Sequence, residues 1–250
     1  MSKRSIKTTK TIFDIIESIQ KLDGPGVSEI AEYNGIAVST AHTHLSTLVE
    51  MEYLRKEGDC YYLSLRFLNQ GVYAKNQHPL NDAIQPALGQ LAEDTGESAW
   101  VVVEEHGWGI NLEGAKGDRG VRTEERMGYR SFLHVHAPGK AILAHLSDDY
   151  VETILEKRGL PRLTENTITD RDTLFTELKG IRDRGYAFDD GEGIQGLSAV
   201  AAPIITDGTI RGAVTVYGPS NRFTDEKFHE DYPETVLGTA NTIELQLIYD

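Results

Sequence analysis

Two stretches in the second half of the chain hold side chains that could bind a ligand or a metal. His134 and His136 flank Val135, and Asp189 and Glu192 lie in or beside a glycine-rich run. Histidines that alternate on a strand would face the same way, and a carboxylate could complete a metal site. Their spacing matches no diagnostic metal-binding pattern, so we predict no bound metal and no cofactor.

The sequence contains no arrangement that is typical of an enzyme. Cys60 is the single cysteine and lies far in sequence from any suitable base, so we expect a small buried residue there. Residues 196–200 read GLSAV and lack the final glycine of a nucleophile elbow. Neither a phosphate-binding loop nor a dinucleotide-binding glycine motif is present. We therefore predict no catalytic residues.

Short polar side chains also cluster nearer the N-terminus, along a helix that we expect from Ser39 to Met51. Ala41, Leu45 and Leu48 recur at helical spacing and form its apolar stripe. The positions that face outward carry hydroxyl and imidazole groups, which suit contact with base edges and phosphates. These candidate DNA contacts are Ser39, Thr40, His42, Thr43, His44 and Thr47.

Basic residues flank this helix. Arg55 and Lys56, in a predicted hairpin, would reach the side of a duplex. Four residues before the first expected helix could follow the phosphate backbone: Lys3, Arg4, Lys7 and Lys10. The outward face lacks arginine, the commonest reader of guanine, so specificity would rest on threonine methyl groups, histidine hydrogen bonds and DNA shape. The alternative is a ligand-sensing protein-interaction module without specific DNA binding.

The elements around this face have the order of a winged helix-turn-helix. We expect a helix over 11–22, a stop at 23–26, a short helix capped by Ser28, a turn at Asn34 and Gly35, the third helix capped by Ser39, and a β-hairpin over 53–64. Two helices joined by a tight turn and followed by a hairpin are typical of this motif.

Beyond residue 66, helical and strand-like segments mix without regular alternation. We expect a helical connector over 66–80, helices over 81–94, from Pro138, over 147–158, from Thr169 to Gly185 and over 225–248 with a bend at Pro233, and strands over 98–105, 109–114, 120–126, 197–205 and 210–217. This mixture predicts an α+β fold. We divide the chain into a winged helix-turn-helix domain (1–66), a linker helix (67–80) and a C-terminal domain (81–250).

The acidic charge is concentrated in the C-terminal part. The chain of 250 residues has a net charge of −14; residues 1–66 hold 8 basic and 9 acidic side chains, and the remainder holds 17 and 30. Molar salt shortens the Debye length to about 3 Å, so such a protein could still bind DNA in a halophilic, haloarchaeal cell. An ordinary acidic protein is the alternative. The single cysteine and the lack of a signal peptide or a bilayer-spanning stretch indicate a cytoplasmic protein with no membrane partner.

Several runs of sequence resemble the IclR family of transcription regulators. In the N-terminal part they are GVSEIA at 26–31 and VSTAHTHL at 38–45. Residues 133–144, LHVHAPGKAILA, resemble the family run LHATALGKALLA. Residues 189–204 resemble its D-x-x-E…G-[LV]-x-C-[IV]-A-A-P run, and residues 212–222 resemble its GA-[LIV]-S-[VI]-S-G-P-x-x-R run. These motifs stand in the family's order and extend over nearly the whole chain.

The resemblance implies a GAF-like C-terminal domain with an antiparallel sheet and flanking helices, and a homodimer or a dimer of dimers. It implies binding to double-stranded promoter or operator DNA, with an affinity that a small organic acid modulates, as activator or as repressor. By motif position, the effector-binding residues are Leu133, His134, His136, Ala137, Gly139, Asp189, Glu192, Ala199, Thr215 and Tyr217.

The chain departs from the family pattern at several of these positions. Thr43 stands where the family often has arginine, Ala199 where it often has cysteine, and Thr215 and Tyr217 where it often has serine. A tyrosine would shrink or reshape the pocket, so we do not assume glyoxylate or pyruvate as the effector.

The residues themselves also favour a ligand pocket. Glycines within residues 191–196 let backbone amides approach a ligand closely. The helix that begins near Pro138 would offer free N–H groups to a carboxylate, and His134, His136 and Thr215 would add donors. An ordinary turn is the alternative interpretation of the glycine run.

Overall fold

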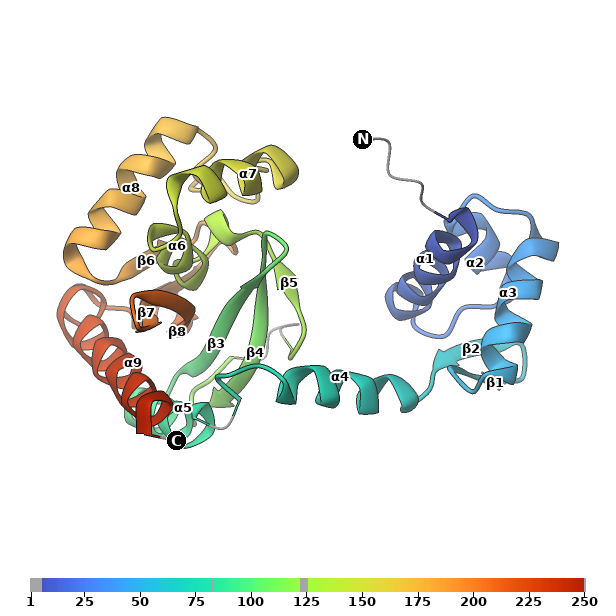
Figure 1. The fold of residues 1–250 in the computed structure, drawn as a ribbon, viewed down its shortest axis with the longest axis horizontal. Helices are drawn as coiled ribbons and strands as arrows, with labels where there is room; N and C mark the ends of the chain where they lie inside the picture. The colour runs from blue at the N-terminus through green and yellow to red at the C-terminus, as the bar shows by residue number, and fades with distance from the viewer. Residues whose placement is uncertain (1–5, 82, 122–125, 250) are drawn as a thin grey trace. The chain divides into compact units, whose positions relative to one another are not determined.

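The computed structural model describes residues 6–81, 83–121 and 126–249, and the chain divides into two compact units, Met1–Ala74 and Lys75–Asp250 (Figure 1). The first unit holds a two-stranded hairpin and the helices around it. The second holds a six-stranded sheet with helices packed on both faces. The α+β class predicted from the sequence is confirmed.

The first unit is built around a small apolar core. Its elements are α1 (Lys7–Leu22), α2 (Val27–Tyr33), α3 (Val38–Glu50), β1 (Leu54–Glu57), β2 (Cys60–Leu63) and most of α4 (Arg66–Asn76). Ile15 of α1, Ile30 of α2 and Leu45 of α3 are buried together, because their helical spacing places each on the inward face of its helix. This packing fixes α3 against α2 and leaves the other side of α3 in solvent.

The helix caps predicted in this unit were wrong. The N-cap of α2 is Gly26, whose amide donates to Oε2 of Glu29 at 2.8 Å, and the N-cap of α3 is Ala37. Ser28 and Ser39 therefore lie inside the first turns, one residue after the helices begin. Cys60 is half-buried rather than buried, because it stands at the start of β2 beside the exposed hairpin turn.

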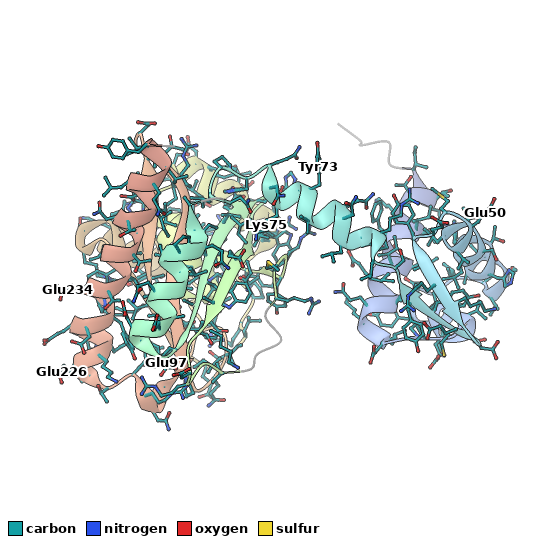
Figure 2. All side chains as sticks on the ribbon, turned by 90° about the horizontal axis from the view of Figure 1, so that it is seen from below. Glu50, Tyr73, Lys75, Glu97, Glu226 and Glu234 are labelled. Carbon is teal, nitrogen blue, oxygen red and sulfur yellow. The ribbon has the colours of Figure 1, made fainter. Side chains whose placement is uncertain are left out.

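Helix α4 buries none of its residues. Leu65, which precedes it, and Leu68 and Val72 recur at positions i, i+3 and i+7 and therefore share one side of the helix. Leu68 is 59% exposed and Val72 is 47% exposed. Tyr73 also projects into open space (Figure 2). An apolar stripe of this kind on an uncovered helix is unusual for an isolated chain.

The second unit contains the remaining elements. They are α5 (Ile84–Thr95), β3 (Ser98–Glu105), β4 (Trp108–Lys116), β5 (Arg130–Ser131), the 3₁₀-helix η1 (Leu133–Val135), α6 (Ala137–Ala144), α7 (Asp148–Arg158), α8 (Arg171–Arg184), β6 (Ala187–Asp190), β7 (Leu197–Thr206), β8 (Thr209–Pro219), the 3₁₀-helix η2 (Ser220–Arg222), the π-helix η3 (Lys227–Asp231) and α9 (Tyr232–Tyr249). The strand order is β5-β4-β3-β8-β7-β6, and all neighbours are antiparallel.

Alternation along the central strands divides this unit into two cores. Val101 and Val103 of β3 and Val214 of β8 pack beneath α5 and α9. Val102 of β3 and Ala213 of β8 face the opposite layer, which α6, α7 and α8 build. Successive side chains on a strand point to opposite faces, so the sequence of each central strand serves both layers.

Several expected elements differ from those observed. Of the expected strand over 120–126, residues 122–125 lie outside the described residues, and the other positions are not in a strand. The N-cap of α8 is Asp170 rather than Thr169, since the Asp170 side chain accepts from the Thr173 amide at 2.9 Å. The expected helix over 225–248 is observed, since residues 225–249 are helical throughout, and a π-helical turn over Lys227–Asp231 directly precedes Tyr232 and Pro233.

Candidate functional site

The outward side of α3 carries most of the residues predicted to contact DNA. Ser39, Thr40, His42, Thr43 and Thr47 are exposed, whereas His44 is half-buried. The apolar stripe of the helix, Ala41, Leu45 and Leu48, is buried. The tight turn at Gly35, where φ is 61°, joins α2 to α3. These polar groups therefore form one uncharged, hydrogen-bonding surface.

Two of the threonines on this surface already use their hydroxyl protons. Oγ1 of Thr43 donates to the carbonyl of Ser39 at 2.9 Å, and Oγ1 of Thr47 donates to the carbonyl of Thr43 at 3.0 Å. Each hydroxyl can then only accept further hydrogen bonds. These side chains suit the amino groups of adenine or cytosine and the methyl group of thymine.

The predicted wing is the β1–β2 hairpin. Arg55 forms an ion pair with Glu57, and the Lys56 ammonium lies over the ring of Tyr61, 5.5 Å from its centroid. Both basic side chains are exposed. Arg55 is thus paired within the hairpin rather than free. Lys7 and Lys10 are exposed in the first turn of α1, and Lys3 and Arg4 lie outside the described residues.

A cavity of about 640 Å³ opens in the second unit, on the face of the sheet that carries α6. The strand register explains its floor, because Asp189 is paired with Ala199 and Ala199 with Tyr217, while Trp100 is paired with Thr215. Its described lining is mostly apolar: Trp100, Val102, Asn111, Val121, Tyr129, Ser131, Val135, His136, Pro138, Leu163, Asp189, Gly193, Ile194, Gln195, Leu197, Ser198, Ala199, Thr215 and Tyr217.

Some of the predicted effector-binding residues line this cavity, and the others lie behind the residues that form its wall. His136, Asp189, Ala199, Thr215 and Tyr217 line the cavity. The residues that do not line it are Leu133, His134, Ala137, Gly139 and Glu192. The segment 133–139 forms a 3₁₀-helix that is followed, after His136, by α6.

Close packing accounts for the residues behind the wall. A Cβ at Gly139 would lie 2.1 Å from the carbonyl oxygen of Leu133, so only glycine lets α6 approach η1 there. His134 is buried, and its Nε2 lies 3.1 Å from the carbonyl of Pro161. Burial lowers the pKa of His134. Gly139 and His134 therefore pack behind the cavity and hold its lining residues in place.

His136 is the N-cap of α6 and also part of the cavity wall. The amide of Gly139 donates to its Nδ1 at 3.0 Å, so the neutral ring carries its proton on Nε2, which contacts Oγ of Ser131. Although part of the ring is open to the cavity, surrounding protein desolvates it, and with weaker effects of His134 and Lys140 this lowers its pKa to about 4. The expectation of free amides at this helix start was wrong for Gly139.

The aromatic end of the cavity is held by contacts across the strands. Nε1 of Trp100 donates to the hydroxyl of Tyr217 at 3.3 Å. The indole lies over Gly114 of β4, where a Cβ would come within 2.7 Å of the ring. Oγ1 of Thr215 donates to the carbonyl of Val200 at 2.9 Å, so this hydroxyl is not a free donor for a ligand.

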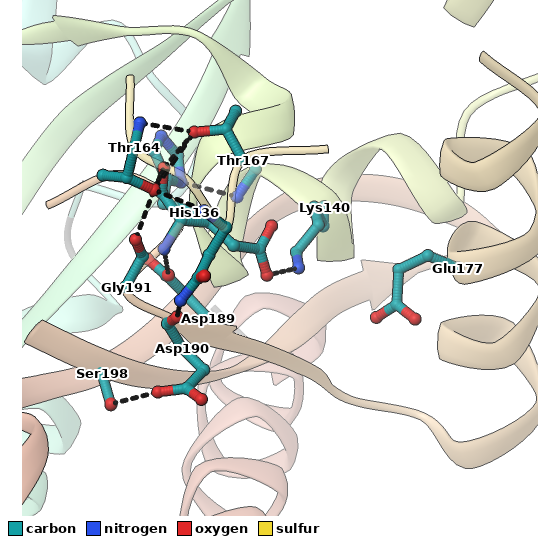
Figure 3. A network of polar contacts seen from close by, with 12 residues as sticks. His136, Lys140, Thr164, Thr167, Glu177, Asp189, Asp190, Gly191 and Ser198 are labelled. Carbon is teal, nitrogen blue, oxygen red and sulfur yellow. Dashed lines mark hydrogen bonds and ion pairs between the residues drawn. The ribbon is translucent and has the colours of Figure 1, made fainter. Parts of the chain in front are cut away.

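An ionic cluster lies at the other side of the cavity (Figure 3). Lys140 of α6 is 2% exposed and is paired with Glu192, while the amide of Glu192 donates to Oδ1 of Asp189 at 2.7 Å. Burial raises the pKa of Asp189 to about 7, and the charge of Glu192 adds to this. Burial also raises the pKa of Glu192, although Lys140 opposes the shift.

Threonines hold the glycine-rich loop that follows β6. Oγ1 of Thr164 donates to the carbonyl of Gly191 at 2.6 Å, and Oγ1 of Thr167 donates to that of Glu192 at 2.7 Å (Figure 3). A Cβ at Gly193 would lie 2.7 Å from the carbonyl oxygen of Val135, so glycine is needed for the loop to approach η1. Gly193, with Ile194 and Gln195, then lines the cavity.

Two polar residues of this region were not predicted from the sequence. Asn111 of β4 lines the cavity and is 5% exposed, and its Nδ2 has no hydrogen-bond partner within the described part of the chain. Lys140 forms the buried ion pair. The sequence could have indicated both residues, because each is a polar residue within an apolar run. Asn111 lies between Ile110 and Leu112, and Lys140 lies within residues 137–144. A buried polar group requires a partner.

Among the described residues, no group of three or more His, Cys, Asp or Glu side chains could hold a metal ion. In the same part of the chain, no helix is long and apolar enough to cross a membrane.

Comparisons with known proteins match both units. The family model described as IclR helix-turn-helix domain matches residues 12–58, and the one described as Bacterial transcriptional regulator IclR C-terminal matches residues 73–245. The chain is 30% identical over 249 residues to a probable HTH-type transcriptional regulator, ArcR, of Halobacterium salinarum, covering 98% of this chain and 95% of that protein.

Solved structures match over the full length. The IclR structure from Thermotoga maritima is 29% identical, with a TM-score of 0.79, covering 98% of this chain and 100% of that one. An IclR homologue from Microbacterium hydrocarbonoxydans, in complex with 4-hydroxybenzoate, is 22% identical with a TM-score of 0.83, covering 98% of this chain and 100% of that one. At that identity the second match shows the shared fold.

Proposed function

Because the chain belongs to the IclR family of transcriptional regulators, we propose that it reads an operator through α3 and that a small organic acid in the C-terminal cavity changes its affinity for that operator. The observation that carries this proposal is the presence, in one chain, of an uncharged polar helix face after a tight turn and a cavity of about 640 Å³. Its site of action is the cytoplasm, where the DNA is.

The proposed base contacts come from the exposed face of α3. His42 and Thr43 lie in the N-terminal half of the helix, the part of a recognition helix that contacts base edges. The hydroxyls of Thr43 and Thr47 are bonded to the helix itself, so they act as acceptors and through their methyl groups. Ser39 and Thr40, in the first turn, are set beside the phosphates.

The wing supplies the charge that α3 lacks. Arg55 exchanges the carboxylate of Glu57 for a phosphate, and Lys56 remains exposed for a second contact. Because an exposed ion pair contributes only about 0–1 kcal/mol, this exchange has a small cost. The wing therefore adds affinity, while α3 supplies specificity.

The lining of the cavity supports a small organic acid with an apolar or aromatic body. Trp100, Tyr217 and the valine side chains would pack against that body, and the Nδ2 donor of Asn111 would face its polar end. In the relative from Microbacterium hydrocarbonoxydans, a fold of the same kind holds 4-hydroxybenzoate. For regulation, the acid must favour one arrangement of the protein by about 1–3 kcal/mol.

The active form is a dimer or a dimer of dimers. The stripe of Leu65, Leu68 and Val72 on α4 supports this proposal, because a second copy would bury an apolar surface that the single chain exposes. Two copies present two α3 helices, so we expect a pseudo-palindromic operator whose half-sites match their spacing.

The test is a footprint of the purified protein on the region upstream of its own gene. Since a good base contact contributes about 1–3 kcal/mol, replacing His42 and Thr43 together by alanine should weaken specific binding by at least about tenfold. Binding of the acid should not change. Unfolding by heat, followed by circular dichroism, checks that the double variant is folded.

Thr153→Ala is the matched control. Thr153 is an exposed threonine on α7, and its hydroxyl donates to the carbonyl of Asp149 at 3.0 Å, as Thr43 does to Ser39. This variant should leave the footprint unchanged. A double variant of His42 and Thr43 that still protects the operator would show that α3 is not the reading helix.

A further inference from the structure

The cavity contains a carboxyl group but no opposite charge to balance an anion. Within the described lining, no residue is lysine or arginine, whereas Asp189 is part of the wall and is 7% exposed. Lys140 is the nearby ammonium group, but it lies outside the lining and is paired with Glu192. An acid anion in this cavity would therefore meet a carboxylate without a free cation.

The remaining charged groups around Asp189 do not supply that charge. His136, on the α6 side, has a pKa lowered to about 4 by burial and is neutral above that pH. His134 lies against the carbonyl of Pro161, and burial lowers its pKa as well. On the other elements, Glu177 of α8 is paired with Arg184, and Asp190 of β6 accepts from Ser198 at 3.3 Å.

Asp189 itself is suited to hold a proton. Burial raises its pKa to about 7, and the neighbouring Glu192 charge acts in the same direction. The amides of Glu192 and Gly193 and the Lys140 ammonium oppose this shift. A ligand carboxylate beside Asp189 would raise the pKa further, as for two carboxyl groups that share one site.

We propose that Asp189 receives the carboxylate of the effector as a protonated carboxyl group, so that one proton is shared between the two carboxyl groups of the complex. This inference rests on the proposed function, because it concerns the acid that the cavity binds. The proton lies between an oxygen of Asp189 and an oxygen of the ligand, and where this proton comes from solvent, binding adds no net charge.

Affinity should then depend on pH in a defined direction. Below pH 7 Asp189 already carries its proton, so the apparent Kd is constant there. Above pH 7 the proton must be taken from solvent, and the apparent Kd rises about tenfold for each pH unit, hence about tenfold between pH 6 and pH 8. Near pH 8, close to one proton is taken up for each ligand bound.

The experiment is isothermal titration calorimetry of the full chain. Benzoate, 4-hydroxybenzoate, pyruvate and glyoxylate are first compared by the rise in melting temperature that each causes. The one that stabilises most is titrated at pH 8 in phosphate and in Tris buffer, whose heats of ionisation differ. The difference between the observed heats gives the number of protons taken up.

Asp189→Asn and Asp190→Asn separate the proposed group from its neighbour. The Asp189→Asn amide can still donate to a carboxylate but cannot titrate, so this variant should bind with the same Kd at pH 6 and pH 8 and take up no proton. Asp190→Asn is the matched control, since Asp190 is exposed and lies outside the lining. It should behave as the wild type does.

The outcomes distinguish this inference from the proposed function. If none of the four acids binds, both the organic-acid function and this inference are wrong. Binding without proton uptake at pH 8, or proton uptake that persists in Asp189→Asn, overturns this inference alone. The titration of the wild-type protein measures proton uptake by itself. The inference can therefore be tested even if a variant fails to fold.

Discussion

Asn111 presents a hydrogen-bond donor to the cavity. Its backbone is bonded to the segment before β5, since its amide donates to the carbonyl of Tyr129 at 3.1 Å, but its Nδ2 has no partner among the described residues. A ligand oxygen in the cavity would accept from this amide, and a hydrogen bond of this kind contributes about 0.5–1.5 kcal/mol.

Asn111→Leu should test this contact. Leucine has a similar volume and no donor, so we expect the melting temperature of the ligand-free protein to stay the same or rise. Affinity for the acid should fall by the corresponding amount, about 0.5–1.5 kcal/mol of binding free energy. Thermal unfolding and calorimetry measure the two quantities. Unchanged affinity would remove Asn111 from the binding site.

The sequence predicted the cavity residues unevenly, for a physical reason. Asp189, Ala199, Thr215 and Tyr217 lie on neighbouring strands, and alternation places them on the same side of the sheet once those strands are paired. Asn111 lies on β4 opposite Val102 of β3, and β3 joins the other cavity strands only through its pairing with β8. That pairing connects segments far apart in the sequence and cannot be read from local spacing.

At the scale of elements, periodicity located the helices well and the short strands poorly. The stripes of α1 and α3 and the caps at Ser147 and Gly185 follow local rules, so these helices begin or end close to the expected residues. β6 was not expected, because its four residues end in two aspartates that are typical of a loop. Pairing with β7 makes it a strand.

The exposed stripe on α4 carries the prediction at this scale. Replacing Leu68 and Val72 by serine should leave the fold intact, because both side chains are largely exposed in the single chain. If a second copy covers them, sedimentation should shift from dimer towards monomer and operator binding should weaken.

Asn69→Ser is the matched control for this pair. Asn69 is an exposed residue of α4 next to the stripe, so its replacement by serine should leave the dimer unchanged. Sedimentation equilibrium over a range of protein concentrations makes the comparison. A Leu68 and Val72 double variant that remains as dimeric as the wild type would assign the interface to another surface.

In the whole molecule, charge is distributed unequally between the DNA-binding part of the chain and the remainder. Residues 1–66 are close to neutral with 8 basic and 9 acidic side chains, whereas the remaining 17 basic and 30 acidic side chains give a net charge of −13. Like charges at this density repel one another and destabilise the compact state. Salt shortens the range of that repulsion.

The melting temperature should therefore rise with KCl. We expect the largest increase between about 0.2 and 2 M, where the Debye length falls from about 7 Å towards 2–3 Å. Differential scanning calorimetry measures this change. A melting temperature that is flat or falls over this range would mean that the acidic surface does not limit stability, and the halophilic interpretation of the composition would be wrong.

The order of elements and the family motifs were predictable at this scale because they extend along the chain and need no tertiary contacts. The position of each cavity residue was less predictable, since η1 and α6 turn the segment 133–139 so that Leu133, Ala137 and Gly139 pack inward. Motif position thus identified the region of the cavity but only some of the residues that line it.

We propose that an acid bound in the cavity changes the affinity of the protein for DNA. The direct measurement is fluorescence anisotropy of a labelled duplex from the region upstream of the gene, titrated with protein in about 2 M KCl, with and without the acid that stabilises the protein most. We predict that the acid changes the Kd for this duplex about 5- to 150-fold and leaves binding to a scrambled duplex unchanged. An acid that binds the protein but leaves the operator Kd unchanged, or the absence of specific DNA binding under every condition, would contradict the account.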